Sequence, residues 1–260
     1  MNSKSNRIIK VIEALAFVVC LVLGVYFIYT KFFQEEEIPK IPSVEKLIEE
    51  KEKQNFEDKE ETKIDVQTYI NQLPEYRNQF GNANIMGKLV IPNLNIDSLV
   101  TRTTDNEYYL GNNIYNQYDG LGVPFFDFRN TDLSNDKQLN IYGHNTTNEK
   151  FYDRLPFINL EAYVNENMFQ NYKDVYLSID ERQIHYRVIA IKIITDSDNE
   201  HMKLRFYNDD DFLNHSNKLL QNTLYKEENI QMSATDHLLV LQVCHYNPPG
   251  TYLLVICKEI

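Results

Sequence analysis

Positive charge and cysteine are both scarce in this chain. Its 260 residues include 26 Lys and Arg against 38 Asp and Glu, which gives a formal net charge of -12 at pH 7. Nucleic acid is therefore not expected as a partner, because its binding requires a surplus of cationic side chains. Three cysteines are too few for a disulfide framework. The sequence also has no internal repeat and no cluster of His, Cys or carboxylate residues with metal-ligand spacing, so neither a metal nor another cofactor is expected.

An apolar run lies near the N-terminus. Residues Ala14 to Tyr29 carry no charge, and with the apolar residues just before them about 20 residues can cross a bilayer. Lys and Arg precede the run and three glutamates follow it, so the positive-inside rule leaves the N-terminus in the cytoplasm. Aromatic rather than small residues end the run, which favours an uncleaved anchor over a signal peptide. We expect residues 1–33 to be the cytoplasmic N-terminus and transmembrane helix of a single-pass type II protein of the cell membrane.

The next segment is dense in Glu and Lys. Residues 34–63 contain few apolar positions, so we expect a solvated helical or disordered spacer outside the membrane. The remaining residues, 64–260, are long enough for one sizeable extracytoplasmic domain.

Short apolar segments divided by turn residues predict a mainly β fold in this domain. Two helices are also expected, at Asp65 to Gln79 and at Asp209 to Lys226, where apolar residues recur on one face. Three acidic residues at positions 209–211 suit a helix N-terminus and are expected to act there rather than in a metal site. The expected strands are Leu89 to Ile91, Leu139 to Tyr142, Val175 to Ile179, Ile184 to Ile194, Leu238 to Val243 and Tyr252 to Cys257.

A thiol and an imidazole each follow an apolar strand. Cys244 ends the run from Leu238, and His144 ends the run from Leu139 about a hundred residues upstream. If the fold brings the two together, the cysteine has the partner that a nucleophile needs. Cys20 lies in the apolar N-terminal run, and Cys257 is expected to be a free thiol.

Five short motifs surround these residues in a recognisable order, and with them the chain resembles the sortases, in particular class B. The resemblance covers roughly residues 64–260 and includes the helix placed just before the cysteine strand. It implies a closed eight-stranded β-barrel with helices added outside. The motifs are Gly87 to Pro92 (GKLVIP), Asp105 to Leu110 (DNEYYL), Phe126 to Asn130 (FDFRN), Tyr142 to His144 (YGH) followed by Phe151 and Leu155, and the Cys244 strand.

The resemblance also implies a reaction. Cys244 attacks a peptide carbonyl in the sorting signal of a surface protein or pilin, and His144 protonates the departing amine. An amino group of a cell-wall precursor or a pilin then takes the acyl group, so the enzyme is a transpeptidase. Gln242 and Val243, directly before the cysteine, are expected to border the substrate.

One position departs from the family. Sortases carry an arginine just before the last strand, where it supports the substrate carbonyl and the developing oxyanion, and here Tyr252 takes that place. A phenol donates one hydrogen bond and has no positive charge. Three arginines elsewhere in the chain are open as replacements, namely Arg102, Arg129 and Arg205.

Two other readings stay open beside the transpeptidase. Tyr252 is also consistent with a catalytically impaired sortase-like protein that binds sorting signals or pilins without processing them. An L,D-transpeptidase also needs Cys and His on a β fold, but it places a serine, histidine and glycine directly before the cysteine, unlike this chain. His245 is a poor candidate for the base, because neighbours on a strand point to opposite faces.

Overall fold

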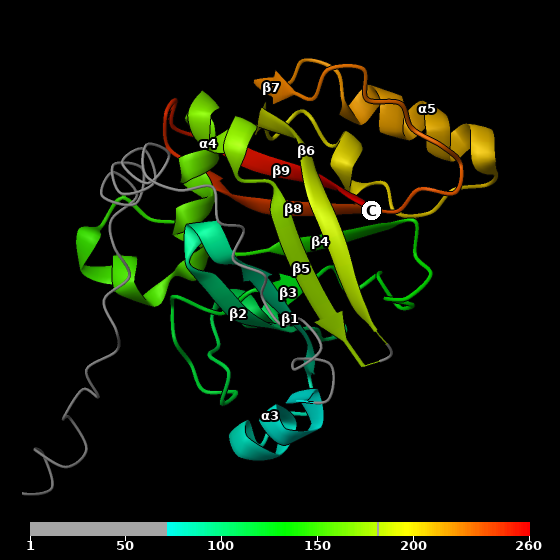
Figure 1. Ribbon diagram of the computed structural model, residues 1–260. Helices are drawn as coiled ribbons and strands as arrows, with labels where there is room; N and C mark the ends of the chain where they lie inside the picture. The colour runs from blue at the N-terminus through cyan, green and yellow to red at the C-terminus, as the bar shows by residue number, and fades with distance from the viewer. Residues whose placement is uncertain (1–71, 181) are drawn as a thin grey trace, which may run out of the picture. The chain divides into compact units, whose positions relative to one another are not determined.

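A closed ring of eight strands lies at the centre of the computed structural model, which describes residues 72–180 and 182–260 (Figure 1). The strands pair in the order β5-β1-β2-β3-β4-β8-β9-β6, and pairing of β6 with β5 closes the ring, while β7 lies outside it beside β6. The predicted mainly β barrel is confirmed. The strands are β1 (Ile85–Ile91), β2 (Ile96–Thr101), β3 (Phe125–Phe126), β4 (Gln138–Tyr142), β5 (Asp174–Ile179), β6 (Gln183–Thr195), β7 (Tyr225–Lys226), β8 (Leu238–His245) and β9 (Thr251–Glu259).

Alternation along β8 explains why its sequence is apolar without interruption. Leu239, Leu241 and Val243 point into the barrel, where they join the larger buried cluster. Leu238 and Val240 point outward into a second cluster with the inner face of a helix. Both faces of this strand are therefore covered, as in sheets packed on two sides.

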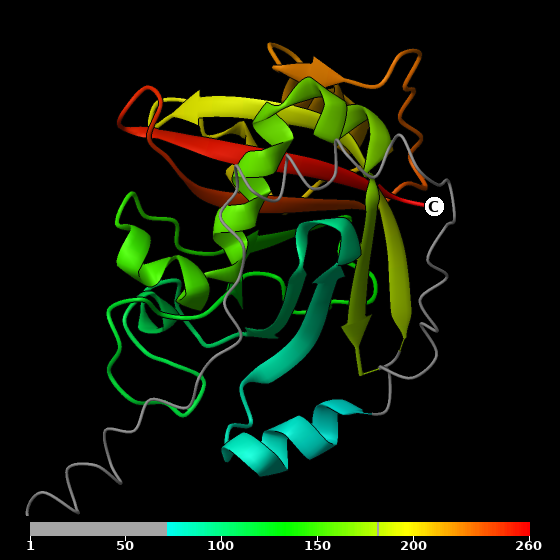
Figure 2. The same ribbon diagram turned by 60° about the vertical axis from the view of Figure 1, so that its left-hand side comes forward.

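Helices and 3-10 turns surround the barrel (Figures 1 and 2), and buried residues of α5 pack in the outer cluster with residues of β6, β8 and β9. The predicted helix at 65–79 is confirmed from residue 73, where α3 begins, and its earlier part lies outside the described residues. The helices are α3 (Leu73–Phe80), α4 (Glu166–Asn171) and α5 (Asp209–Leu219), and the 3-10 turns are η3 (Pro92–Leu94), η4 (Tyr108–Leu110), η5 (Glu149–Arg154), η6 (Pro156–Val164) and η7 (Glu200–Met202).

The start of α5 follows the sequence prediction, whereas its end does not. The Asn208 side chain accepts a hydrogen bond from the Asp211 amide at 2.9 Å, and the three acids occupy the first turn. The helix stops at Leu219, so the predicted extension to Lys226 is wrong. Asn222 adopts a positive φ of 53°, and the Leu224 amide then donates to the Ile191 carbonyl at 2.7 Å. Pairing with β6 therefore replaces the last helical turn.

The predicted anchor and spacer, residues 1–33 and 34–63, lie outside the described residues. Within 72–180 and 182–260, no helix combines the length and the apolar character needed to cross a bilayer.

The corrected end of α5 predicts a difference between two leucines. Leu219 is 1% exposed in the outer cluster, whereas Leu224 is 41% exposed. We expect Leu219→Ala to lower the free energy of unfolding by about 2–5 kcal/mol and Leu224→Ala to change it by less than about 0.5 kcal/mol. Urea unfolding of the full-length protein measures both, and equal losses would contradict the observed helix end.

Candidate active site

The parallel pairing of β4 with β8 brings the predicted cysteine and histidine to one edge of the barrel. Tyr142 is the register partner of Gln242, and the Gly143 amide donates to the Gln242 carbonyl at 3.0 Å. His144 and Cys244 each follow this pair by two residues. They therefore lie at the same level, where two neighbouring strands about 4.8 Å apart come to an end.

Asn145 and the half-buried carboxylate of Glu161 tie the ends of these two strands together. The Asn145 amide donates to the Cys244 carbonyl at 2.8 Å and to Glu161 Oε1 at 2.9 Å. Burial raises the pKa of Glu161, although the His245 ring, 2.9 Å away, and Asn145 oppose the rise. Asn145 and Glu161 thus fix the two loops behind the thiol, and nothing in the sequence singles them out.

His245 takes part in that support and lies away from the thiol. It is 4% exposed, with Nδ1 against Glu161 and Nε2 donating to the Asn247 carbonyl at 2.6 Å. The strand continues through His245 without a turn, so its side chain points to the face opposite Cys244. The sequence-based objection to His245 as the base is thereby confirmed.

The orientation of His144 is set by the DNEYYL segment. Its Nε2 lies 2.8 Å from the Leu110 carbonyl oxygen, at the end of η4. Since a carbonyl can only accept, Nε2 carries the proton of this hydrogen bond. Nδ1 is then the ring nitrogen that can take up and release a proton.

Gly143 is required by close packing. A Cβ atom at this position would lie 2.4 Å from Cδ2 of Phe157, well inside contact distance. Phe157 is itself buried in the barrel core, as η6 covers this end of the barrel. The glycine of the YGH motif therefore allows the backbone at the end of β4 to pack directly on the phenyl ring. His144 follows this contact by one residue.

The Cys244 thiol is half-buried on the outer face of β8, the face that also carries Gln242. Burial raises the pKa of the thiol, while hydrogen bonds to its own backbone and to the Tyr246 phenol oppose that rise. Cys257 is also free, as expected, but it is fully buried and burial raises its pKa strongly. Val243 points into the core at 1% exposure, so only its backbone is available to a substrate.

Tyr252 lies directly across from Cys244 in the register of β8 and β9. Paired residues of antiparallel strands project to the same face, so phenol and thiol are neighbours. The phenol hydrogen-bonds the Asp196 carboxylate, and that bond, followed by burial and the charges of Asp196 and Cys244, raises the pKa of Tyr252. The phenolic proton of Tyr252 therefore has a carboxylate close by that can accept it.

The three arginines considered as replacements are engaged elsewhere. Arg102 donates to the Asn130 carbonyl, and Arg205 pairs with Asp136 at 2.7 Å. Arg129 forms two hydrogen bonds with the buried Asp127, at 2.8 and 2.7 Å. These contacts all belong to the segment between β3 and β4 and its neighbours.

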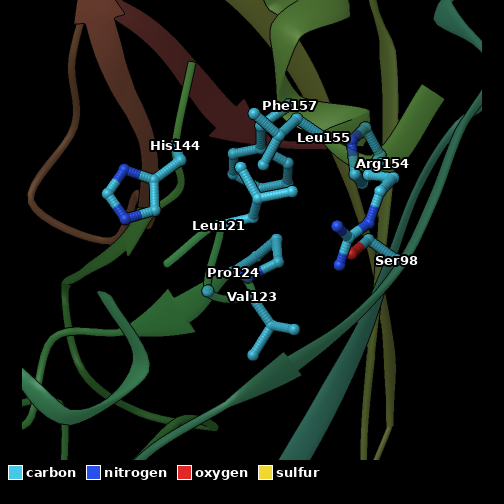
Figure 3. Close-up of a pocket in the computed structure, with 10 residues that line it drawn as sticks. Ser98, Leu121, Val123, Pro124, His144, Arg154, Leu155 and Phe157 are labelled. Atoms are coloured by element: carbon cyan, nitrogen blue, oxygen red, sulfur yellow. The ribbon is translucent and has the colours of Figure 1, made fainter. Parts of the chain in front are cut away.

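A small cavity borders His144. It measures about 80 Å³, and Cys244 is not among its lining residues. Figure 3 shows the apolar side chains Leu121, Leu155 and Phe157 between His144 and Arg154. Arg154, which the sequence analysis did not consider, pairs with Asp119 at 2.5 Å. Among residues 72–180 and 182–260, this guanidinium lines the cavity that the predicted histidine also lines.

Comparison with solved structures identifies this barrel as a sortase fold. Sortase B of Clostridium perfringens superposes with a TM-score of 0.65 at 26% identity, covering 72% of this chain and 98% of that one. Sortase B of Listeria monocytogenes gives 0.62 at 23% identity, covering 72% and 99%. A Staphylococcus aureus sortase B–substrate complex gives 0.64 at 18% identity, covering 82% and 91%.

Sequence comparison agrees with the fold. The chain is 28% identical to sortase B of Listeria monocytogenes over 164 residues, which is 63% of each protein. It is 20% identical to sortase B of Staphylococcus aureus over 181 residues, 69% of this chain and 71% of the relative. No protein-family model matches the chain. In fold and in sequence the chain is therefore similar to the class B sortases, the resemblance that the ordered motifs predicted.

The packing at Gly143 generates a prediction about the site. We expect Gly143→Ala to displace Phe157 or the end of β4, and a shift of about 1 Å between reacting groups costs on the order of 100-fold in rate. A crystal structure of the variant and its rate of acylation by a sorting-signal peptide test this. Gly120→Ala is the matched control, since its Cβ would meet only the Tyr118 hydroxyl at 3.9 Å. An active variant with an unmoved His144 would contradict the role of Gly143.

Proposed function

We propose that the protein is a cysteine transpeptidase acting on the C-terminal sorting signal of surface proteins or pilins. The Cys244 thiolate attacks a peptide carbonyl, a carbon–sulfur bond forms, and the carbon–nitrogen bond breaks as His144 protonates the leaving amine. An incoming amine then attacks the thioester, gives up a proton and releases the thiol. Water in place of the amine would give hydrolysis.

One observation carries this proposal, namely the common level of His144 and Cys244 at the ends of β4 and β8. A nucleophile and its proton-transfer partner need such a juxtaposition, and neither residue is sealed in the core. Gln242 extends the same face and is proposed to border the peptide, together with the backbone of Val243.

The proposed partners are inferred by analogy with relatives. One sortase B structure is a substrate complex and another is a complex with triglycine, both at 18% identity to this chain. By analogy, a sorting-signal peptide is the proposed acyl donor and an amine of a cell-wall precursor or pilin the proposed acceptor. Membrane anchoring through residues 1–33, with the catalytic domain outside the cell, stays a prediction from the sequence.

A second candidate function is favoured by Tyr252. Its hydroxyl interacts with the Asp196 carboxylate and is therefore less available as a donor to an oxyanion. Removal of one oxyanion donor lowers enzymatic rates by about 100- to 1000-fold. A sortase-like protein that binds sorting signals or pilins without cleaving them would show this arrangement.

Adduct formation tests the main proposal. We expect full-length protein incubated with a library of sorting-signal peptides to form a thioacyl adduct on Cys244, detected by mass spectrometry. Cys244→Ala should abolish the adduct, whereas Cys257→Ala, the matched thiol control, should leave it. Binding without an adduct in the wild type, with an adduct restored by Tyr252→Arg, would instead support the impaired protein.

The anchor has a test of its own. Because cations precede the apolar run and small residues do not follow it, we expect the protein extracted from membranes to keep its original N-terminus. N-terminal sequencing measures this. A chain beginning near residues 30–40 would show a cleaved signal peptide, and protease sensitivity of residues 64–260 from the cytoplasmic side would show the opposite orientation.

A further inference from the structure

Two tyrosines flank the Cys244 thiol, and their hydroxyl groups differ in what they can donate to. Tyr252 on β9 holds the Asp196 carboxylate, a charged acceptor. Tyr246, just beyond the end of β8, donates to the backbone carbonyl of Asn145 at 3.0 Å. A neutral carbonyl is the weaker acceptor, so the proton of Tyr246 is the easier of the two to redirect.

The contacts of Asn145 place the Tyr246 hydroxyl beside the reacting groups. Asn145 directly follows His144, and its side-chain amide donates to the Cys244 carbonyl at 2.8 Å. The phenol donates to the backbone carbonyl of the same residue, and it lies close enough to the thiol for Cys244 to raise the pKa of Tyr246. Tyr246 therefore bridges the strand of the cysteine and the loop of the histidine.

The thiol and the thiolate of Cys244 form different hydrogen bonds with this phenol. A neutral thiol can donate its proton to the phenolic oxygen while the phenol donates to Asn145. A thiolate can only accept, and as a charged group it is a much stronger acceptor than a backbone carbonyl. Ionisation of Cys244 therefore favours rotation of the phenolic proton toward the sulfur.

We propose that Tyr246 is a catalytic residue, whose hydroxyl turns from the Asn145 carbonyl to the Cys244 sulfur and stabilises the thiolate by donating a hydrogen bond. The role in turnover rests on the proposed transpeptidase function, whereas the contact with sulfur does not. At 41% exposure the Tyr246 side chain is open to an incoming peptide. It thereby supplies, without a positive charge, part of the stabilisation that the absent arginine would give.

The other titratable groups near the Cys244 sulfur are less suited to donate a hydrogen bond to it. They are Tyr252 on β9 with Asp196 bonded to it, His144 after β4, and Glu161 on η6, whose charge acts on the Tyr246 phenol. Nε2 of His144 is occupied by the Leu110 carbonyl, and Glu161 is an acceptor bound to Asn145 and His245.

Alkylation by iodoacetamide across pH tests the proposal without any sorting signal. The thiolate displaces iodide, so a carbon–sulfur bond forms, a carbon–iodine bond breaks, and the rate follows the ionised fraction of Cys244. We expect Tyr246→Phe to move the midpoint of alkylation upward by about one to two pH units, the size of one hydrogen bond to a charged group. At pH 7 the rate should fall at least about tenfold. Peptide mass mapping of the full-length protein assigns the modified cysteine.

Tyr252→Phe is the matched control and should leave the midpoint in place, since that phenol serves Asp196. Cys257 reports folding, because at 0% exposure it is alkylated only when the barrel opens. If Tyr246→Phe exposes Cys257, Tyr246→Leu must give the upward shift in a protected protein. An unmoved midpoint in the folded variant, or an equal shift in Tyr252→Phe, would overturn the proposal. A shift in a protein that forms no peptide adduct would refute the transpeptidase function and leave the thiolate contact standing.

Discussion

Parallel pairing between β4 and β8 is the constraint on which the rest of the site depends. Parallel strands end on the same side of a sheet, so residues at equal distances beyond the Tyr142 and Gln242 pair meet at one edge. Cys244 and His144 are a hundred residues apart in the chain, and this register alone brings them to the same level. The barrel closes around that pair, because β9 and β6 on one side and β3, β2 and β1 on the other are joined through β5.

The polar groups behind the thiol hold this edge together where regular pairing stops. β4 ends at Tyr142, and beyond it side-chain hydrogen bonds replace the backbone hydrogen bonds between the strands. The Asn145 side chain donates to the Cys244 carbonyl and to Glu161. Even partial burial of a carboxylate is costly unless it is paired, and His245 provides the partner of Glu161. The candidate site is thus built on hydrogen-bonded groups, and the two residues proposed to perform the chemistry, Cys244 and His144, are only partly buried.

The resemblance to sortases places Tyr252 where the family has an arginine, and this difference bears on the electrostatics of the proposed site. A guanidinium would lower the pKa of a neighbouring thiol, whereas the pair of Tyr252 and Asp196 brings negative charge to the same end of β9. Burial of Cys244 acts in the same direction as the missing cation. With no guanidinium described beside Cys244, the thiolate is stabilised by hydrogen bonds from neutral donors such as the proposed one from the Tyr246 phenol.

The sequence by itself determined the class of fold, the strands of the core and the two residues of the proposed reaction, because alternating apolar segments and ordered motifs are local signals. It also determined the start of α5, since a cap and acidic first turn need only neighbouring residues. The end of α5 depended on pairing of residues 225–226 with β6, which no local pattern encodes. The same holds for Glu161, Asn145 and Arg154. Their partners are 16 to 99 residues distant, so only the tertiary structure could bring them to Cys244 and His144.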